Sequence, residues 1–149
     1  KYKCSSIDHL ENIGDEEINI IKHSNTMPTL LPNASFFLNM PYAPARKFID
    51  NNISIAIASD YNPGTAPSAN MQFVWSLACI KMKLTPEEAF NAITLNAAFA
   101  MDISQNYGSI TKNKIANIII THDIPSIAYI PYDFGNNNIS KIILNGKLI

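Results

Sequence analysis

The sequence lacks the marks of several large classes of protein. Its 11 Lys and Arg residues are balanced by 12 Asp and Glu residues, and the basic residues form no run. A surface for nucleic acid or for an anionic membrane is therefore not expected. No apolar stretch reaches the roughly 18 residues that a membrane-spanning helix needs. We accordingly expect no nucleic acid and no membrane among the partners of this protein.

Cysteine is scarce, and the first residue is not methionine. Cys4 and Cys79 lie far apart and in no metal-binding spacing, so we expect two reduced, buried thiols in a cytoplasmic protein. A disulfide or a ligand role is the alternative. The sequence opens at Lys1 inside a strand-like run, without the apolar segment of a signal peptide. We therefore expect further strands to precede it in a longer protein.

Three strand-like runs occur in the first 60 residues. Residues 2–8 alternate weakly, and residues 26–32 form a second run in which Pro28 disfavours a fully regular ladder. Residues 53–60 are almost wholly apolar up to Asp60, which is typical of a parallel strand buried on both faces. With helices between them, these runs predict an α/β sheet or barrel.

Helical patterns separate and follow these strands. The run Asp15–Glu17 suits a first helical turn because negative charge is favourable at a helix N-terminus, and Ile18, Ile20 and Ile21 then form an apolar stripe. Thr85 begins the strongest helix signal, with proline next and glutamate three residues on. The other predicted helices cover residues 43–51, 69–82 and, as one or two helices, 85–100.

The last part of the chain changes character. Strand signals cover residues 108–110, 115–121, 139–144 and 147–149, and Asn145-Gly146 is a favoured two-residue hairpin turn. We therefore expect a βα-alternating segment, residues 1–103, and a small antiparallel β segment, residues 104–149.

Polar residues follow the predicted strands at the positions where βα folds place their chemistry. Asp60 ends an apolar strand, so its carboxylate must be solvated, paired or bound to a metal. It is a metal ligand or general base, or else a residue that only fixes its loop. His9 has the same placement after Asp8, and a hydrogen-bonded structural histidine is the alternative. His23 and His122 lack such placement and are interpreted as structural.

The loop after Asp60 has recognition capacity. Asn62 and Thr65 carry side chains that can donate hydrogen bonds, and Gly64 allows a ligand to approach the backbone closely. A plain connecting loop is the alternative. Met71, Trp75, Met82 and Met101 could line a ligand pocket, but their spacing favours core packing.

Taken in order, the motifs resemble the imidazolonepropionase family of the amidohydrolase superfamily. They are Ser-Ile-Asp-His-Leu-Glu at 6–11, Thr-Leu-Leu-Pro at 29–32, Asp-Tyr-Asn-Pro-Gly-Thr at 60–65 and Leu-Thr-Pro-Glu-Glu-Ala at 84–89. The resemblance implies the last three units, strands 6–8, of a TIM-type (βα)8 barrel, followed by part of a small β-sandwich. It also implies one Zn²⁺ or Fe³⁺ ion, a possible homodimer, and hydrolysis of 4-imidazolone-5-propanoate to N-formimidoyl-L-glutamate in histidine degradation.

The resemblance assigns roles to five residues. It implies that Asp60 is a metal ligand and the catalytic proton shuttle, that His9 is catalytic, and that Asn62, Gly64 and Thr65 bind substrate. The family's His-x-His pair and its other metal histidine have no counterpart among these 149 residues. A complete metal site cannot be built from one carboxylate and one histidine, so we expect the chain alone to be inactive.

Two other functions are kept open. One is a different cyclic amidohydrolase of the same architecture, such as a dihydroorotase-like or deaminase-like enzyme. The loop around Asn62 argues against it, because this loop reads the substrate in the resembling family. The other is a non-catalytic module of the same fold, which the missing half of the metal site would support.

Overall fold

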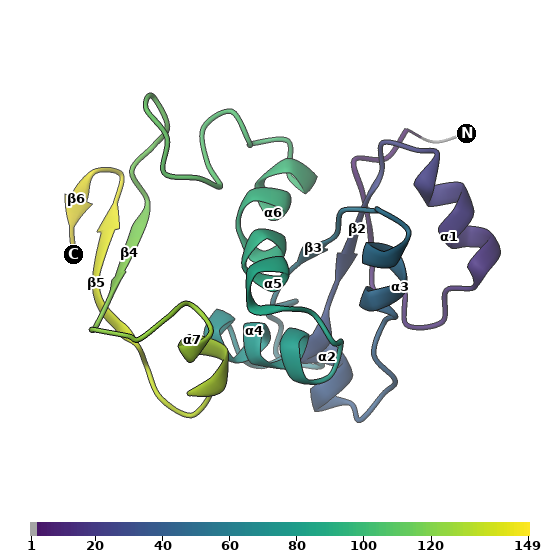
Figure 1. Ribbon diagram of the computed structural model, residues 1–149, viewed down its shortest axis with the longest axis horizontal. Coiled ribbons are helices and arrows are strands. Elements are labelled where there is room, and N and C mark those ends of the chain that lie inside the picture. The colour runs from purple at the N-terminus through teal and green to yellow at the C-terminus, as the bar shows by residue number, and fades with distance from the viewer. Residues whose placement is uncertain (1–2) are drawn as a thin grey trace.

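Two separate three-stranded sheets organise the computed structural model, which describes residues 3–149 (Figure 1). The first sheet contains β1 (Ser6–Asp8), β2 (Met27–Leu30) and β3 (Ala56–Ile57) in that spatial order. Both pairings are parallel. The predicted alternation of parallel strands and helices is therefore confirmed, with β2 at the centre of the sheet.

Seven helices surround and follow this sheet in the described residues. They are α1 (Asp15–Lys22), α2 (Pro32–Phe37), α3 (Ala45–Asp50), α4 (Met71–Ile80), α5 (Pro86–Ile93), α6 (Leu95–Ala100) and α7 (Tyr129–Tyr132). The predicted helices are confirmed with shorter bounds, whereas α2 and α7 were not predicted. No helix in the described part of the chain has the length and apolarity to cross a membrane.

In the view of Figure 1, α1 and α3 lie to the right of β2, and α5 and α6, which both contact β3, lie to its left. Leu30 and Ile57 stand opposite each other in the register, so both side chains point to the same face. There they share an apolar core with Ile18 of α1 and Phe48 of α3. Phe48 is fully buried, which stabilises the fold by about 1.5–3 kcal/mol.

Several sequence expectations need correction. The predicted strand 53–60 pairs as a strand only at Ala56–Ile57, opposite Thr29 and Leu30 of β2, although Ile53 and Ile55 are buried. Pro28, the preceding residue of β2, has no N–H to donate to a ladder. Ile20 is 63% exposed rather than part of the apolar stripe, because residues three apart share a helix face and Ile18 and Ile21 already define that face.

The cysteine prediction holds in part. Both cysteines are free, but Cys4 is exposed because it precedes β1 at the open edge of the sheet. Cys79 is half-buried in α4, and burial there raises the pKa of its thiol to about 11. Trp75 and Met82 are buried in the core and Met71 packs against it, as their spacing predicted. For Met101 the prediction was wrong, because this residue caps the end of α6 and is 70% exposed.

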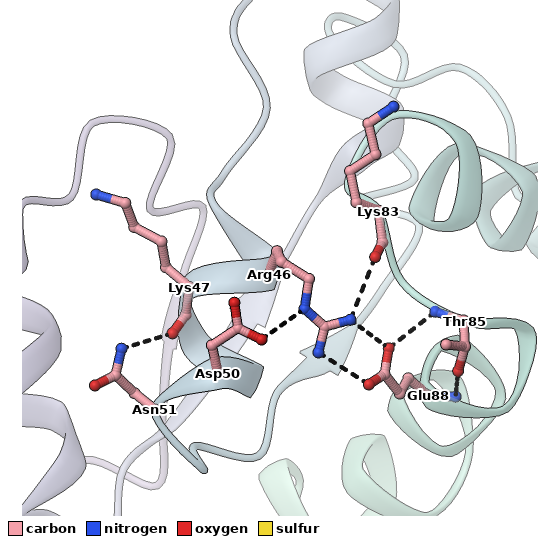
Figure 2. Close-up of polar contacts among 7 residues, drawn as sticks. All are labelled: Arg46, Lys47, Asp50, Asn51, Lys83, Thr85 and Glu88. Carbon is pink, nitrogen blue, oxygen red and sulfur yellow. Dashed lines mark hydrogen bonds and ion pairs between the residues drawn. The ribbon is translucent and has the colours of Figure 1, made fainter.

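An ion pair fastens α3 to α5 (Figure 2). Thr85 and Glu88 form the predicted capping box, with the Glu88 N–H donating to Thr85 Oγ1 and the Thr85 N–H donating to Glu88 Oε2. Both terminal nitrogens of Arg46 donate to the same carboxylate, at 2.8 and 2.9 Å. The hydrogen bond from Arg46 lowers the pKa of Glu88 from its ordinary value.

The second sheet is antiparallel and contains β4 (Ile118–Thr121), β5 (Ile139–Leu144) and β6 (Lys147–Leu148). Asn145 and Gly146 join β5 to β6 with φ of 50° and 78°, which suits the predicted hairpin turn. The predicted strand at 108–110 was wrong. Gly108 turns the chain there with φ of 88°, and a Cβ at this position would lie 2.7 Å from Cβ of Ala98. This close approach to α6 makes a packed turn instead of a strand.

Candidate functional site

The carboxyl ends of the three parallel strands bring the predicted site residues to one end of the sheet. His9 directly follows β1, and its N–H donates to Thr29 O of β2 at 3.0 Å. Ala58 follows β3, and its N–H donates to Leu30 O at 3.2 Å. These two bonds hold the residues that follow β1 and β3 against the central strand β2. The structure therefore places His9 and Asp60 on either side of β2, as a βα site requires.

The backbone is strained where the predicted catalytic residues lie. His9 and Leu10 are consecutive left-handed residues with φ of 72° and 73°, and Asp60 has φ of 50°. This conformation costs roughly 1–2 kcal/mol for a residue with a side chain, although aspartate adopts it more readily. Such strain persists only where the surroundings enforce it, and it is concentrated at functional sites.

Asn62 organises the loop that follows Asp60. Its Oδ1 accepts the N–H of Gly64 at 2.9 Å and the N–H of Thr65 at 2.7 Å. Its Nδ2 donates to Asp60 O at 2.7 Å and lies 2.9 Å from Thr65 Oγ1. The loop is thus preorganised by its own side chains, and Asp60, Asn62 and Thr65 are half-buried while Gly64 is exposed. Asn62 and Thr65 are satisfied by each other in this conformation.

Glu11 was quoted in a motif but given no role from the sequence. Its side chain is only 9% exposed, and its Oε1 lies 3.4 Å from His9 Nδ1. Ser35 of α2 donates to the same oxygen, also at 3.4 Å. A carboxylate at this place favours the tautomer of His9 that carries its proton on Nδ1, which leaves Nε2 as an acceptor. The histidine is 54% exposed and open to a ligand.

The polar residues of α2 escaped prediction because the helix itself did. Asn33 and Ser35 are buried, at 3% and 2% exposure. Asn33 donates to main-chain oxygens on both sides of the Asp60 loop. The single sequence signal for this helix was Pro32, a residue favoured at the first helical position.

A separate cavity lies elsewhere in the described residues. It has a volume of about 610 Å³, and its lining includes Met27, Ile53, Asn96 and Phe99. Met27 is the first residue of β2, so the cavity stands at the amino end of the sheet. Parallel βα folds bind their ligands at the carboxyl ends of the strands. This cavity is therefore separate from the site at His9 and Asp60.

The donor set is incomplete for a metal ion. Among residues 3–149, no three His, Cys, Asp or Glu side chains gather closely enough to hold one. Catalytic zinc sites use three protein ligands and keep one position for water or substrate. Asp60 can provide one oxygen ligand, but the described residues by themselves do not fit a whole metal site.

Comparisons with known proteins agree with this architecture. Residues 5–149 match the model of the amidohydrolase family. The chain is 54% identical over 149 residues to an imidazolonepropionase of Christiangramia forsetii and 51% identical over 149 residues to one of Flavobacterium johnsoniae. Each match covers the whole of this chain but only 36% of the relative's length.

A solved structure extends the likeness to the fold. A zinc-bound adenosine deaminase from Xanthomonas campestris superposes with a TM-score of 0.86 at 18% identity. The match covers 98% of this chain and 37% of that protein. At this identity the likeness concerns the fold alone.

Proposed function

This chain belongs to the amidohydrolase family, and we propose that it supplies one part of the active site of an imidazolonepropionase. The reaction proposed for the whole protein is hydrolysis of the cyclic amide 4-imidazolone-5-propanoate to N-formimidoyl-L-glutamate. The observation that carries the proposal is the identity of 54% and 51% to relatives of that name along the entire chain.

The proposal assigns the two segments to parts of a larger fold. The parallel strands β1, β2 and β3, each leading into a helix, would be strands 6–8 of a TIM-type barrel. The antiparallel sheet of residues 104–149 would belong to a small β-sandwich. Relatives about three times as long leave ample chain for the remaining strands and for the sheet that would cover β4–β6.

Each predicted residue has a chemical task in this proposal. Asp60 lies at the end of β3, where its carboxylate can accept a proton from the attacking water and return it to the leaving nitrogen. His9 can donate from Nε2, when that nitrogen is protonated, to the oxygen that gains charge on the ring carbonyl. The loop of Asn62, Gly64 and Thr65 would contact the substrate, with Asn62 fixing the loop's shape.

A Zn²⁺ or Fe³⁺ ion is part of the proposed enzyme. The zinc bound by the adenosine deaminase of similar fold supports a metal in the proposed enzyme. Asp60 would be the only ligand from this chain, and the histidine ligands would come from the remainder of the protein. A cytoplasmic location and a homodimer complete the proposal.

The test is an assay of the natural gene product that carries this chain. We expect loss of 4-imidazolone-5-propanoate and formation of N-formimidoyl-L-glutamate, both followed by mass spectrometry. Residues 1–149 alone, the matched control, should give no turnover. Deamination of adenosine or guanine by the gene product, with no ring opening, would favour another amidohydrolase. Turnover by residues 1–149 alone would contradict the assignment of a partial site.

A further inference from the structure

One buried amide closes the loop that carries most of the predicted site. Asn33, the second residue of α2, is 3% exposed. Its Nδ2 donates to Ser59 O at 3.2 Å and to Ser68 O at 2.9 Å. Ser59 immediately precedes Asp60, and Ser68 stands just beyond Pro67 at the far end of the loop. One side chain therefore joins the start and the end of the loop.

The joined loop contains Asp60, Asn62, Gly64 and Thr65. Hydrogen bonds made by Asn62 fix its interior, but they do not connect it to the rest of the sheet. Asn33 makes that connection from the helix after the central strand β2. If the amide is removed, the carbonyls of two half-buried serines lose this donor, and movement of the loop toward water would restore their hydrogen bonds.

We propose that Asn33 is a positioning residue of the active site, which sets the place of the Asp60 loop relative to β2. The same helix reaches the other half of the site, because Ser35 donates to the Glu11 carboxylate beside His9. Helix α2 thus bonds to a neighbour of each predicted catalytic residue, Ser59 before Asp60 and Glu11 beside His9. The inference on Asn33 rests on the proposed function for its kinetic consequence, but the effect on the loop can be measured without turnover.

A general structural role for a buried asparagine is the competing explanation, and the chain offers a matched control. Asn96 of α6 donates to Ile55 O, just before β3, at 2.8 Å. Its replacement removes an amide-to-carbonyl bond of the same kind at the opposite end of β3. If loss of any such bond simply loosens β3, substitutions of Asn33 and Asn96 should increase hydrogen exchange equally.

The experiment compares Asn33→Leu, Asn33→Ser and Asn96→Leu in the natural gene product. Hydrogen exchange is measured for peptides that cover residues 60–68, together with kcat and KM for 4-imidazolone-5-propanoate. Asn33→Leu should speed exchange in this loop and lower kcat/KM about 100-fold. We expect a lower kcat because Asp60 is displaced, and a higher KM because Asn62 and Thr65 move with the loop. Asn33→Ser keeps one short donor and should lie between Asn33→Leu and the parent protein.

The outcomes separate the two hypotheses. Faster exchange confined to residues 60–68 in the Asn33 variants, with no such change in Asn96→Leu, supports the positioning role. Unchanged loop exchange in Asn33→Ser and Asn33→Leu, or equal changes in all three variants, overturns it. If Asn33→Leu does not fold, Asn33→Ser decides alone. A parent protein without ring-opening activity would refute the proposed function, while the exchange data would still decide the role of Asn33 in the loop.

Discussion

The two segments of the chain bury their apolar residues to very different degrees. Nearly all buried hydrophobic residues belong to the βα segment, and Ile130 is the one from beyond residue 103 among those described. In the terminal sheet, Ile119 is 59% exposed and Ile120 is 42% exposed. Neighbouring residues of a strand point to opposite faces, so this sheet has exposed isoleucines on both faces.

This difference shows which segment buries its apolar residues by its own contacts. The βα segment has a core, a capped helix and an ion pair that connect its parts, and the predicted site residues lie on it. The terminal sheet meets the rest of the chain mainly where α7 packs against α4 and where Gln72 bonds to Asn137 and Asn138. Exposed apolar surface of this kind marks an interface, which agrees with the proposed β-sandwich.

The largest expected effect follows from the chemistry of the βα segment. Asp60→Asn in the natural gene product should lower kcat by about 1,000-fold or more, because an amide cannot accept the proton. Asp123→Asn changes an exposed aspartate of the terminal segment in the same way and should leave kcat unchanged. Steady-state kinetics decides the comparison. Near-normal turnover by Asp60→Asn would remove this residue from the mechanism.

The second comparison concerns stability. Phe48→Ala empties a fully buried position and should cost about 3–5 kcal/mol in urea unfolding of residues 1–149. Ile119→Ala in the same chain should change the free energy of unfolding by less than about 0.5 kcal/mol, because the side chain is exposed.

Measuring Phe48→Ala and Ile119→Ala in the natural gene product as well tests whether the terminal sheet is covered there. If other strands cover the terminal sheet there, Ile119→Ala should cost about 2–5 kcal/mol, as for a buried residue. An equally small cost of Ile119→Ala in both proteins would mean that this face of the sheet has no cover.

The sequence predicted elements well where local signals were strong. Thr85 with its proline and glutamate gave the start of α5, and Asn145-Gly146 gave the last hairpin. The sequence-based prediction failed where contacts between distant parts of the chain determine the secondary structure. The apolar run 53–60 pairs over only two residues because pairing depends on the partner strand, in which only Thr29 and Leu30 align with it. The turn at Gly108 depends on its close contact with α6.

The candidate site followed the same rule. His9 and Asp60 were found because strand ends can be predicted from sequence, and the structure brings them to the same end of one sheet. Their catalytic roles remain predictions. Asn33 bonds to Ser59, which lies 26 residues further along the chain. Glu11 accepts a hydrogen bond from Ser35, which belongs to a helix that was not predicted. Local sequence patterns contain no information on such contacts.

A pH-dependent effect is expected for the βα segment, where all four ion pairs of residues 3–149 lie. Hydrogen bonding to Arg46 lowers the pKa of Glu88 below its ordinary 4.5. The charged form of Glu88 therefore stabilises the fold above pH 4.5, and this contribution is lost as the pH falls through the lowered pKa. Glu88→Gln should lower the melting temperature at pH 7, and this effect should shrink as the pH falls through the lowered pKa of Glu88.

The control for this prediction is Glu17→Gln. Glu17 also accepts a main-chain N–H near a helix start, from Gly14 at 3.1 Å, but it has no arginine partner among the described residues. Its substitution should lower the melting temperature at pH 7 by less. Equal losses for Glu17→Gln and Glu88→Gln would mean that Arg46 adds nothing to the stability of the α3–α5 contact.

The smallest effect is expected in the terminal segment, at the turn between β5 and β6. Gly146 has φ of 78°, and an added Cβ would meet no atom within 4 Å. Gly146→Ala should therefore cost about 1 kcal/mol through backbone strain alone, and Gly146→Asn should cost less because asparagine tolerates this conformation. Hydrogen exchange should rise in β5 and β6 but not in residues 60–68. If exchange also rises in that loop, the two segments are coupled more strongly than the few contacts through α7 and Gln72 indicate.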